Sequence, residues 1–153
     1  MSYEYEIQTV EAVPTVSIRR VVPMEQIAQA MGEIYGRLAA FTAEHGVQPA
    51  GPPYSRYHAI TEAGFDLEAG FPLTAAAAGE GYIVAGELPG GRAAVYTHTG
   101  SYHKLGDAHA AGAAWVKEQG AEESGGPWEY YISDPGGTPE NELQTRIFRP
   151  LKD

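Results

Sequence analysis

The segment of this chain with the most chemistry in it is Pro127–Pro135, in which one carboxylate stands among aromatic side chains. Successive side chains of a β-strand point to opposite faces of the sheet. Trp128 and Tyr130 therefore share one face, and their apolar character predicts that this face packs beneath a helix. Glu129 and Tyr131 share the other face, which we expect to line a cleft.

A carboxylate at the base of an aromatic cleft suits a particular class of ligand. Burial without a partner would cost Glu129 several kcal/mol or force it to take up a proton. A flat organic cation would restore the charge balance and add cation–π contacts worth ~0.5–2 kcal/mol each. The alternative is that tyrosine hydroxyls or the partner strand already satisfy Glu129, and the sequence leaves both interpretations open.

The elements around this segment follow from an internal repeat. The same features occur twice in the same order, and the offset between them drifts only between 74 and 78 residues. Each copy contains an apolar residue followed by proline, a Gly-Pro turn before a strand, and a closing strand that ends in Pro-Leu. The matching phrases are Val13-Pro14 with Leu88-Pro89, Gly51-Pro52-Pro53 with Gly125-Gly126-Pro127, and Gly70-Phe71-Pro72-Leu73 with Phe148-Arg149-Pro150-Leu151.

Each repeat also contains one predicted helix. Apolar residues three or four positions apart run from Met24 to Phe41 and again from Leu105 to Trp115, which is typical of one buried helical face. We expect the helices to stop at Gly46 and Gly120, where a left-handed C-cap favours glycine. Ser101 is the expected N-cap of the second helix, and His98 is expected to shape the turn before it.

These elements predict an α+β fold in a single domain, 1–153, built by tandem pseudo-two-fold duplication of a ββαββ-like unit. Repeat one covers about 3–73, a connector follows at 74–81, and repeat two covers about 82–151. Pairing the two halves would give a curved antiparallel sheet with two helices on one side and a ligand cleft on the other. Clefts between such halves are favoured sites for small ligands.

The repeat adds residues to the predicted site. Ser55 and Tyr57 occupy the positions in repeat one that Glu129 and Tyr131 occupy in repeat two. The predicted cleft therefore holds two tyrosines, one from each half, and a single carboxylate between them. Asp66 and Glu68 alternate along an extended segment, and we expect them to be solvated.

Several phrases resemble those of the GyrI-like, or effector-binding, domain family, and together they span nearly the whole chain in the family's order. The phrases are Tyr57-His58, Asp66-Leu67-Glu68-Ala69-Gly70-Phe71-Pro72, Leu88-Pro89-Gly90-Gly91-Arg92, His98-Thr99-Gly100-Ser101-Tyr102, Trp128-Glu129-Tyr130-Tyr131 with Asp134-Pro135, and Glu142-Leu143-Gln144-Thr145-Arg146-Ile147. The resemblance implies the drug-sensing half of multidrug-responsive regulators, in which a buried glutamate binds lipophilic cations. Its counterpart here is Glu129, whereas the DNA-binding half has no counterpart in this sequence.

Three functions fit these residues. The first is a stand-alone binding domain for hydrophobic, cationic or planar aromatic molecules, with Glu129, Tyr131, Tyr57, Ser55 and Trp128 as ligand contacts. The second is hydrolysis of strained cyclopropane-containing alkylating toxins, which the resemblance links to a Trp-Glu pair. There Glu129 would position or activate water and Tyr131 would stabilise the oxyanion. The third is a gyrase-inhibitor-like protein-binding module, for which the acidic surface would matter.

Composition and charge exclude other classes. The formal net charge of −10 and the absence of a basic stripe argue against direct nucleic-acid binding. The chain has no cysteine, no apolar run of membrane-spanning length and no signal peptide, so a cytoplasmic location is expected. His103 and His109 are six residues apart, about 240° around a helix, and we expect neither a metal site nor a cofactor.

Overall fold

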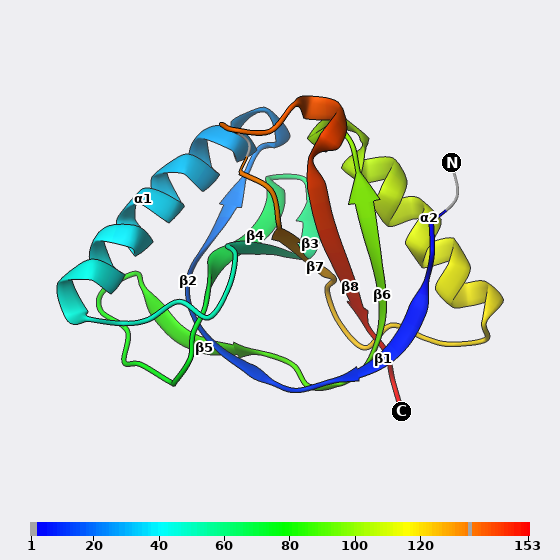
Figure 1. The fold of residues 1–153 in the computed structure, drawn as a ribbon, viewed down its shortest axis with the longest axis horizontal. Coiled ribbons are helices and arrows are strands. Elements are labelled where there is room, and N and C mark those ends of the chain that lie inside the picture. The colour runs from blue at the N-terminus through cyan, green and yellow to red at the C-terminus, as the bar shows by residue number, and fades with distance from the viewer. Residues whose placement is uncertain (1–2, 135) are drawn as a thin grey trace. The chain divides into compact units, whose positions relative to one another are not determined.

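The computed structural model describes residues 3–134 and 136–153. The chain divides into two compact units. The inner unit is Ala12–Pro89, and the outer unit consists of the described residues of 1–11 and 90–153. Each unit contains four antiparallel strands and one long helix (Figure 1).

The inner unit contains β2 (Val13–Val22), α1 (Ile27–His45), β3 (Tyr54–Thr61), β4 (Gly64–Pro72) and β5 (Val84–Leu88). Its strand order is β3-β4-β2-β5, and every neighbouring pair is antiparallel. One short 3-10 turn precedes α1. The helix packs on one face of this sheet, which leaves the other face without a helix of the same unit.

The outer unit contains β1 (Glu6–Val10), β6 (Gly91–Thr99), α2 (Leu105–Glu118), β7 (Trp128–Tyr131) and β8 (Gln144–Pro150). Its strand order is β1-β6-β8-β7, again antiparallel throughout. The helix α2 covers one face of these strands through contacts of Ala108 and Val116. Among the described residues, the 3-10 turns are Met24–Gln26, Tyr102–Lys104 and Glu140–Glu142.

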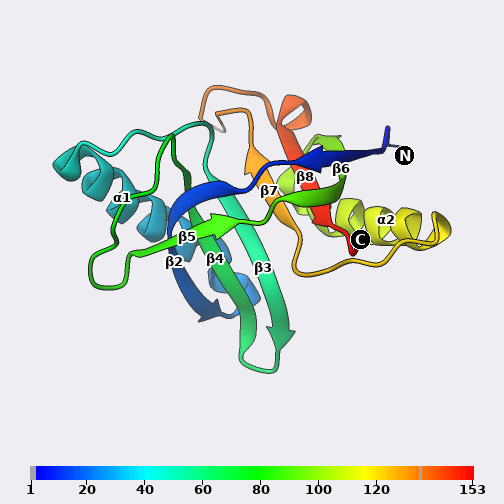
Figure 2. The same ribbon diagram turned by 90° about the horizontal axis from the view of Figure 1, so that it is seen from below.

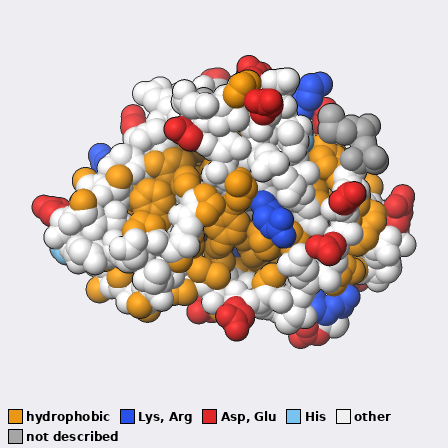
Figure 3. Space-filling view, in the orientation of Figure 1, with side chains coloured by type: hydrophobic (Ala, Val, Ile, Leu, Met, Phe, Trp, Pro, Cys, Tyr) orange, Lys and Arg blue, Asp and Glu red, His pale blue; other side chains and the backbone are white. Residues whose placement is uncertain are grey.

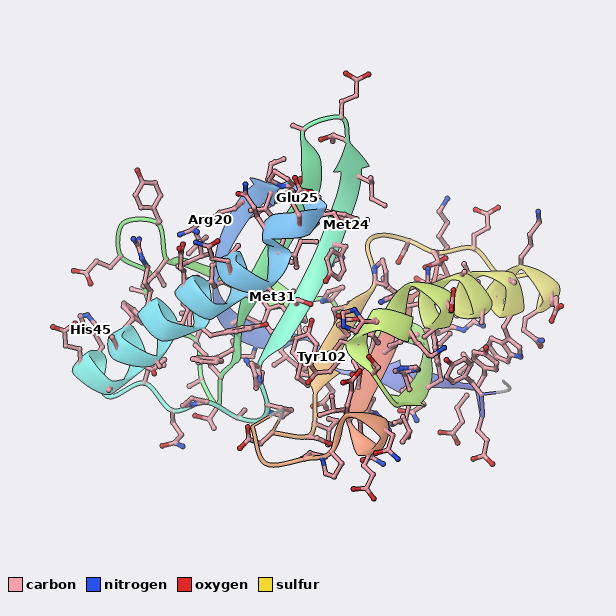
Figure 4. The ribbon with its side chains drawn as sticks, turned by 90° about the horizontal axis from the view of Figure 1, so that it is seen from above. Arg20, Met24, Glu25, Met31, His45 and Tyr102 are labelled. Atoms are coloured by element: carbon pink, nitrogen blue, oxygen red, sulfur yellow. The ribbon has the colours of Figure 1, made fainter. Side chains whose placement is uncertain are left out.

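Both predicted helices are present, and both end where glycine was expected to end them. Gly46 and Gly120 have positive φ angles of 64° and 71°, a left-handed conformation that glycine adopts without a steric penalty. The apolar stripe of α1 buries Ile34 and Leu38 completely. The prediction was wrong at Met24, which precedes the α-helix in a 3-10 turn and is largely exposed (Figure 4).

The two units exchange their edge strands relative to the repeats of the sequence. β1 belongs to repeat one but pairs with β6, and β5 belongs to repeat two but pairs with β2. Figure 2 shows the chain passing from β1 directly into β2, and from β5 into β6. The predicted α+β class and the duplicated ββαββ-like unit are confirmed, whereas the predicted sequence boundaries of the repeats stay a prediction.

Strand register supports the predicted equivalence of positions between the halves. Ser55 lies opposite Ala69, and Glu129 lies opposite Ile147, which is the same step along the two hairpins. Two residues further on, Tyr57 and Tyr131 lie opposite Leu67 and Thr145. Ser55 and Glu129 are thus equivalent in the two sheets, and so are Tyr57 and Tyr131.

On the face seen in Figure 3, acidic side chains stand apart from one another and do not form one continuous stretch. Such a distribution produces a weaker local field than a single-sign patch does. Within residues 3–134 and 136–153, no helix combines the length and the hydropathy that crossing a membrane requires.

Candidate functional site

Glu129 is almost completely buried, with 1% of its surface exposed, and it accepts a hydrogen bond on each carboxylate oxygen. The Tyr131 hydroxyl donates to Oε1 at 2.6 Å. The other oxygen, Oε2, lies 2.8 Å from Nε2 of His109. The predicted pairing of Glu129 with Tyr131 on one face of β7 is therefore present in the structure, whereas His109 is a partner that the sequence did not suggest.

The face of β7 that carries Glu129 was assigned wrongly. His109 belongs to α2, and Ile147, directly opposite Glu129, packs against Ala108 of the same helix. Glu129 therefore lies on the helix-bearing face of the outer sheet. Trp128, expected beneath the helix, lies on the other face, where its ring stacks on Phe148 at 5.5 Å. A ligand of Glu129 must approach on the helix-bearing face, not on the opposite one.

The tautomer of His109 follows from its second neighbour. Nδ1 of His109 lies 3.0 Å from NH1 of Arg149. A guanidinium nitrogen can only donate, so Nδ1 must be the acceptor and the proton must sit on Nε2. His109 is thus a neutral imidazole that donates to Glu129. A hydrogen bond of this kind orients the carboxylate without cancelling its charge.

Arg149 itself is neutralised on its other side. Its Nε lies 2.8 Å from Oε1 of Glu123, and NH2 donates to Oε2 of the same carboxylate at 3.4 Å. One positive charge and one negative charge therefore offset each other there. We refer to Glu129, Tyr131, His109, Arg149 and Glu123 as the Glu129 cluster.

Close docking of α2 on β6 places His109 within reach of the carboxylate. The hydroxyl of Tyr96, a β6 residue, donates to the carbonyl oxygen of Ala108 at 2.9 Å. A β-carbon at Gly112 would lie 1.9 Å from that hydroxyl, so the helix needs glycine at this position to approach the sheet. Burial raises the pKa of Tyr96 to about 12, and the nearby Arg149 offsets only part of this effect.

The turn into α2 is built as predicted. The Ser101 hydroxyl accepts a hydrogen bond from the backbone nitrogen of His103 at 3.1 Å, although it caps the 3-10 turn and not α2 directly. His98 is fully buried and lies 3.1 Å from the Ser101 carbonyl oxygen through Nε2. On its other side, the hydroxyl of Tyr3 lies 2.9 Å from Nδ1. His98 thus ties the turn to the N-terminal segment.

The remaining predicted contacts lie in the inner unit. Ser55 is fully buried, and Tyr57 packs against a cluster that contains Val22 and Leu67, with Ile27 of α1 at its edge. Both residues thus face the helix of their own unit, as Glu129 and Tyr131 do in theirs. Their meeting Glu129 in a shared cleft stays a prediction. Pro135, the last residue of the PWEYYISDP segment, lies outside the described residues.

Each unit also has a surface pocket away from these residues. The pocket of the outer unit has a volume of about 510 Å³ and is lined by Tyr3, Glu6, Thr97 and Arg146 among others. The pocket of the inner unit measures about 360 Å³ and lies beside the end of α1 at His45. Glu129 lines neither of them.

Sequence reasoning missed His109, Arg149 and Glu123 of the Glu129 cluster, which tertiary structure brings together. His109 was considered only as a metal ligand, although it directly follows Ala108 of the apolar stripe of α2. Arg149 was interpreted as part of a closing phrase, although two residues along β8 from Ile147 it shares that residue's face. Tyr102, which lies beside the cluster, was also missed, and its position immediately after the Ser101 cap was the available signal.

The family follows from the whole chain. Residues 3–152 match the model of the GyrI-like small molecule binding domain. The chain belongs to this family. No curated protein matches the sequence. As a GyrI-like domain, the chain is a small-molecule-binding domain.

Solved structures share the fold of this GyrI-like domain. The EcmrR C-terminal domain is 21% identical with a TM-score of 0.84, over 100% of this chain and 99% of that one. EcmrR in its DNA complex gives a TM-score of 0.85 at 20% identity over 99% of this chain, which spans only 58% of that protein.

SAV2435 bound to tetraphenylphosphonium is 15% identical with a TM-score of 0.63, over 97% and 94% of the two chains. A hydrolase encoded by lin2189 from Listeria innocua is 12% identical with a TM-score of 0.68, over 97% and 92%. Identities this low establish a common fold and nothing more.

Proposed function

We propose that this GyrI-like domain binds lipophilic cationic or planar aromatic molecules, and that the carboxylate of Glu129 is the anchor. The observation that carries the proposal is a glutamate that is only 1% exposed and lies beside aromatic side chains. Tyr131 and His109 hold its carboxylate in place through one hydrogen bond to each oxygen. The positive group of a ligand would add an ion pair to these hydrogen bonds.

The energetics favour a cationic ligand over a neutral one. A cation placed beside a buried carboxylate offsets part of the cost of burying that charge. Aromatic rings stand beside the carboxylate, because Tyr131 and Tyr102 pack edge to face at 5.6 Å. Such rings can add cation–π attraction to the ion pair. SAV2435, which shares the fold, binds tetraphenylphosphonium, a cation of this class.

The test is calorimetric titration with tetraphenylphosphonium and with neutral triphenylphosphine oxide. Wild type is expected to bind the cation and to discriminate against the neutral compound. Glu129→Gln keeps the size and shape of the side chain but removes its charge, and we expect affinity for the cation to fall about tenfold or more, which corresponds to ~1.4 kcal/mol. The matched control is Glu68→Gln in the inner unit, with a change of less than about twofold.

Two results would overturn the proposal. One is the absence of binding by any lipophilic cation to wild type. The other is equal binding by Glu129→Gln and wild type, because the carboxylate would then contribute nothing. Circular dichroism of both variants, measured in parallel, separates a loss of the ligand contact from a loss of the fold.

A catalytic alternative rests on the short contact between Tyr131 and Glu129. A carboxylate that orients water beside a phenolic donor is suited to hydrolysis of a strained electrophile, and the lin2189 product, which shares the fold, is described as a hydrolase. Incubation with a cyclopropane-containing alkylating compound and mass spectrometry would reveal a product 18 Da heavier, the mass of one water. Wild type must form this product and Glu129→Gln must not, otherwise the catalytic hypothesis is wrong.

A further inference from the structure

The side chain of Tyr102 stands beside the Glu129 cluster without belonging to it. Tyr102 opens the 3-10 turn that leads into α2, and Figure 4 shows it at this end of the helix, next to β7. Its ring meets the ring of Tyr131 edge to face, with centroids 5.6 Å apart and an interplanar angle of 66°. Tyr131 in turn donates to Glu129, so Tyr131 contacts both the ring of Tyr102 and the carboxylate.

The two hydroxyl groups differ in what they bind. The hydroxyl of Tyr131 donates to Glu129, whereas the hydroxyl of Tyr102 is buried and has no hydrogen-bond partner among the described residues. Thr145, directly opposite Tyr131 in β8, has a buried Oγ1 that likewise has no partner among these residues. Buried polar groups are nearly always hydrogen-bonded in native proteins. The lack of a partner for these two hydroxyls next to Tyr131 therefore needs an explanation.

The protonation state of Tyr102 decides which bond it can make. Burial, followed by the negative charges of Glu129 and Asp134, raises the pKa of Tyr102 above its usual value. The phenol therefore keeps its proton at neutral pH and acts as a donor. Its natural partner is an acceptor oxygen or nitrogen.

We propose that Tyr102 is a specificity-determining ligand contact, which selects cations that also carry a hydrogen-bond acceptor. This inference rests on the proposed function, because it assigns the positive group of the ligand to Glu129. The Tyr102 hydroxyl then donates to an ether, ester or carbonyl oxygen of the same molecule. Thr145, opposite Tyr131 in β8, offers a second hydroxyl. Binding would pair groups that the free protein leaves unpaired, which is the arrangement that rewards the correct functional group most strongly.

The experiment compares probes that differ in a single acceptor. The probes are tetraphenylphosphonium and its 3- and 4-methoxycarbonyl derivatives, which retain the cation and add one ester that accepts but cannot donate. We expect at least one ester isomer to bind wild type about five- to tenfold more tightly than the parent cation, the usual gain from one good hydrogen bond. In Tyr102→Phe that advantage over the parent cation disappears, because phenylalanine keeps the ring and loses only the hydroxyl.

A matched control is Tyr82→Phe, which removes the hydroxyl of a highly exposed tyrosine in the inner unit and should leave every affinity unchanged. If wild type binds none of the probes, the proposed function fails. If wild type binds the cation but favours no ester, or if Tyr102→Phe keeps the ester advantage, only the role of Tyr102 fails. Equal losses for all probes in Tyr102→Phe would show a packing contact and would also overturn the inference.

The ligand-free protein supplies an independent readout. Deleting a hydroxyl that has no partner should leave the melting temperature of Tyr102→Phe equal to that of wild type or slightly above it. A fall of several degrees would show that the hydroxyl already serves a protein group, and the inference would be wrong.

Discussion

Two groups of the same residue types, one in each unit, differ in what surrounds them. In the outer unit, Glu129 is bonded to Tyr131 and His109. In the inner unit, Glu68 accepts a hydrogen bond from the hydroxyl of Tyr54 and lies 2.8 Å from Nε2 of His58. We call Glu68, Tyr54 and His58 the Glu68 cluster. The expectation that Glu68 is solvated was wrong, since its side chain is only 14% exposed.

The charges around the two carboxylates are arranged differently. Glu68 lies directly between two arginines in the sheet, with Arg19 opposite in β2 and Arg56 opposite in β3. Arg19 also forms a two-bond ion pair with Asp66, which lowers the pKa of that carboxyl. In the Glu129 cluster, the guanidinium of Arg149 contacts His109 and is paired with Glu123.

This difference teaches that residue type alone does not make a binding site. In the inner unit, a glutamate, a tyrosine and a histidine form a group beside two arginines of the neighbouring strands. In the outer unit the same three types lie beside one arginine, which contacts the histidine and a second glutamate. The two clusters differ in the ion pair of Arg149 with Glu123, and not in the types of residue that contact the carboxylate.

The largest expected effect comes from removing Arg149 from this ion pair. Arg149→Met should lower the free energy of unfolding by about 2–3 kcal/mol, because its side chain is only 8% exposed and its loss breaks a largely buried ion pair. Arg19→Met is the control in the Glu68 region. Its side chain is 54% exposed, and loss of its pair with Asp66 should cost less than about 1 kcal/mol. Urea unfolding at pH 7 measures both values.

The comparison between the clusters would lose its basis if the two arginine variants were equally stable. Equal values would mean that Arg149 is as well solvated in solution as Arg19, and the tautomer of His109 would no longer be fixed. The nitrogen chemical shifts of His109 in wild type provide a direct check, because the Nε2-protonated tautomer has a characteristic pattern.

Strand alternation was sufficient to predict which residues share a face of the strand. It could not predict which of the two faces meets the helix. It paired Glu129 with Tyr131 correctly, and the repeat made Ser55 and Tyr57 their equivalents. The assignment of faces failed because it assumed that the more apolar side of β7 meets the helix. Trp128 and Glu129 are both buried, so each face of this strand is covered and hydrophobicity cannot distinguish them.

Long-range contacts limited the prediction of the site in the same way. The helices and their glycine ends follow from local spacing and backbone preference. The contact between His109 and Arg149 joins positions 40 residues apart, and neither residue has a local pattern that indicates the other. Helical periodicity predicted the stripe that contains Ala108 and Gly112, but only the docking of α2 decides that His109 reaches β7.

A second prediction tests that docking through two helical glycines. Gly112→Ala would place a methyl group 1.9 Å from the hydroxyl of Tyr96, which is buried. We expect a loss of about 1–3 kcal/mol from this overpacking. Gly36→Ala in α1 meets nothing within 4 Å, and the better helix propensity of alanine should stabilise the protein by up to ~1 kcal/mol.

The essential outcome is that the two variants change stability in opposite directions, with Gly112→Ala less stable and Gly36→Ala more stable than wild type. Chemical denaturation gives both values, and tetraphenylphosphonium titration of Gly112→Ala then tests the link to the site. A shift of α2 away from β6 should weaken binding through the displaced His109. Neutral or positive stability for Gly112→Ala would show that α2 does not need to lie this close to the sheet.

The smallest expected effect concerns two buried tyrosines, one in each unit, at alkaline pH. Burial raises the pKa of Tyr96 to about 12, and burial together with the charge of Glu68 raises the pKa of Tyr54 further. An unfolded tyrosine loses its proton near pH 10. Above that pH the unfolded state binds fewer protons than the native state, so stability falls with rising pH by up to ~1.4 kcal/mol per unit for each tyrosine.

Phenylalanine variants isolate each contribution. Tyr96→Phe and Tyr54→Phe should both be less stable than wild type at pH 8, because each loses a hydrogen bond made by its hydroxyl, to Ala108 and to Glu68 respectively. Between pH 10 and 11 the difference in unfolding free energy between wild type and each variant should decrease. Only wild type loses stability when this tyrosine is deprotonated in the unfolded state. Urea unfolding at pH 8, 10 and 11 measures this narrowing. A gap that narrows for Tyr96→Phe but stays constant for Tyr54→Phe would mean that Tyr54 is solvated in solution, and the Glu68 cluster would then be an open surface group and not a buried one.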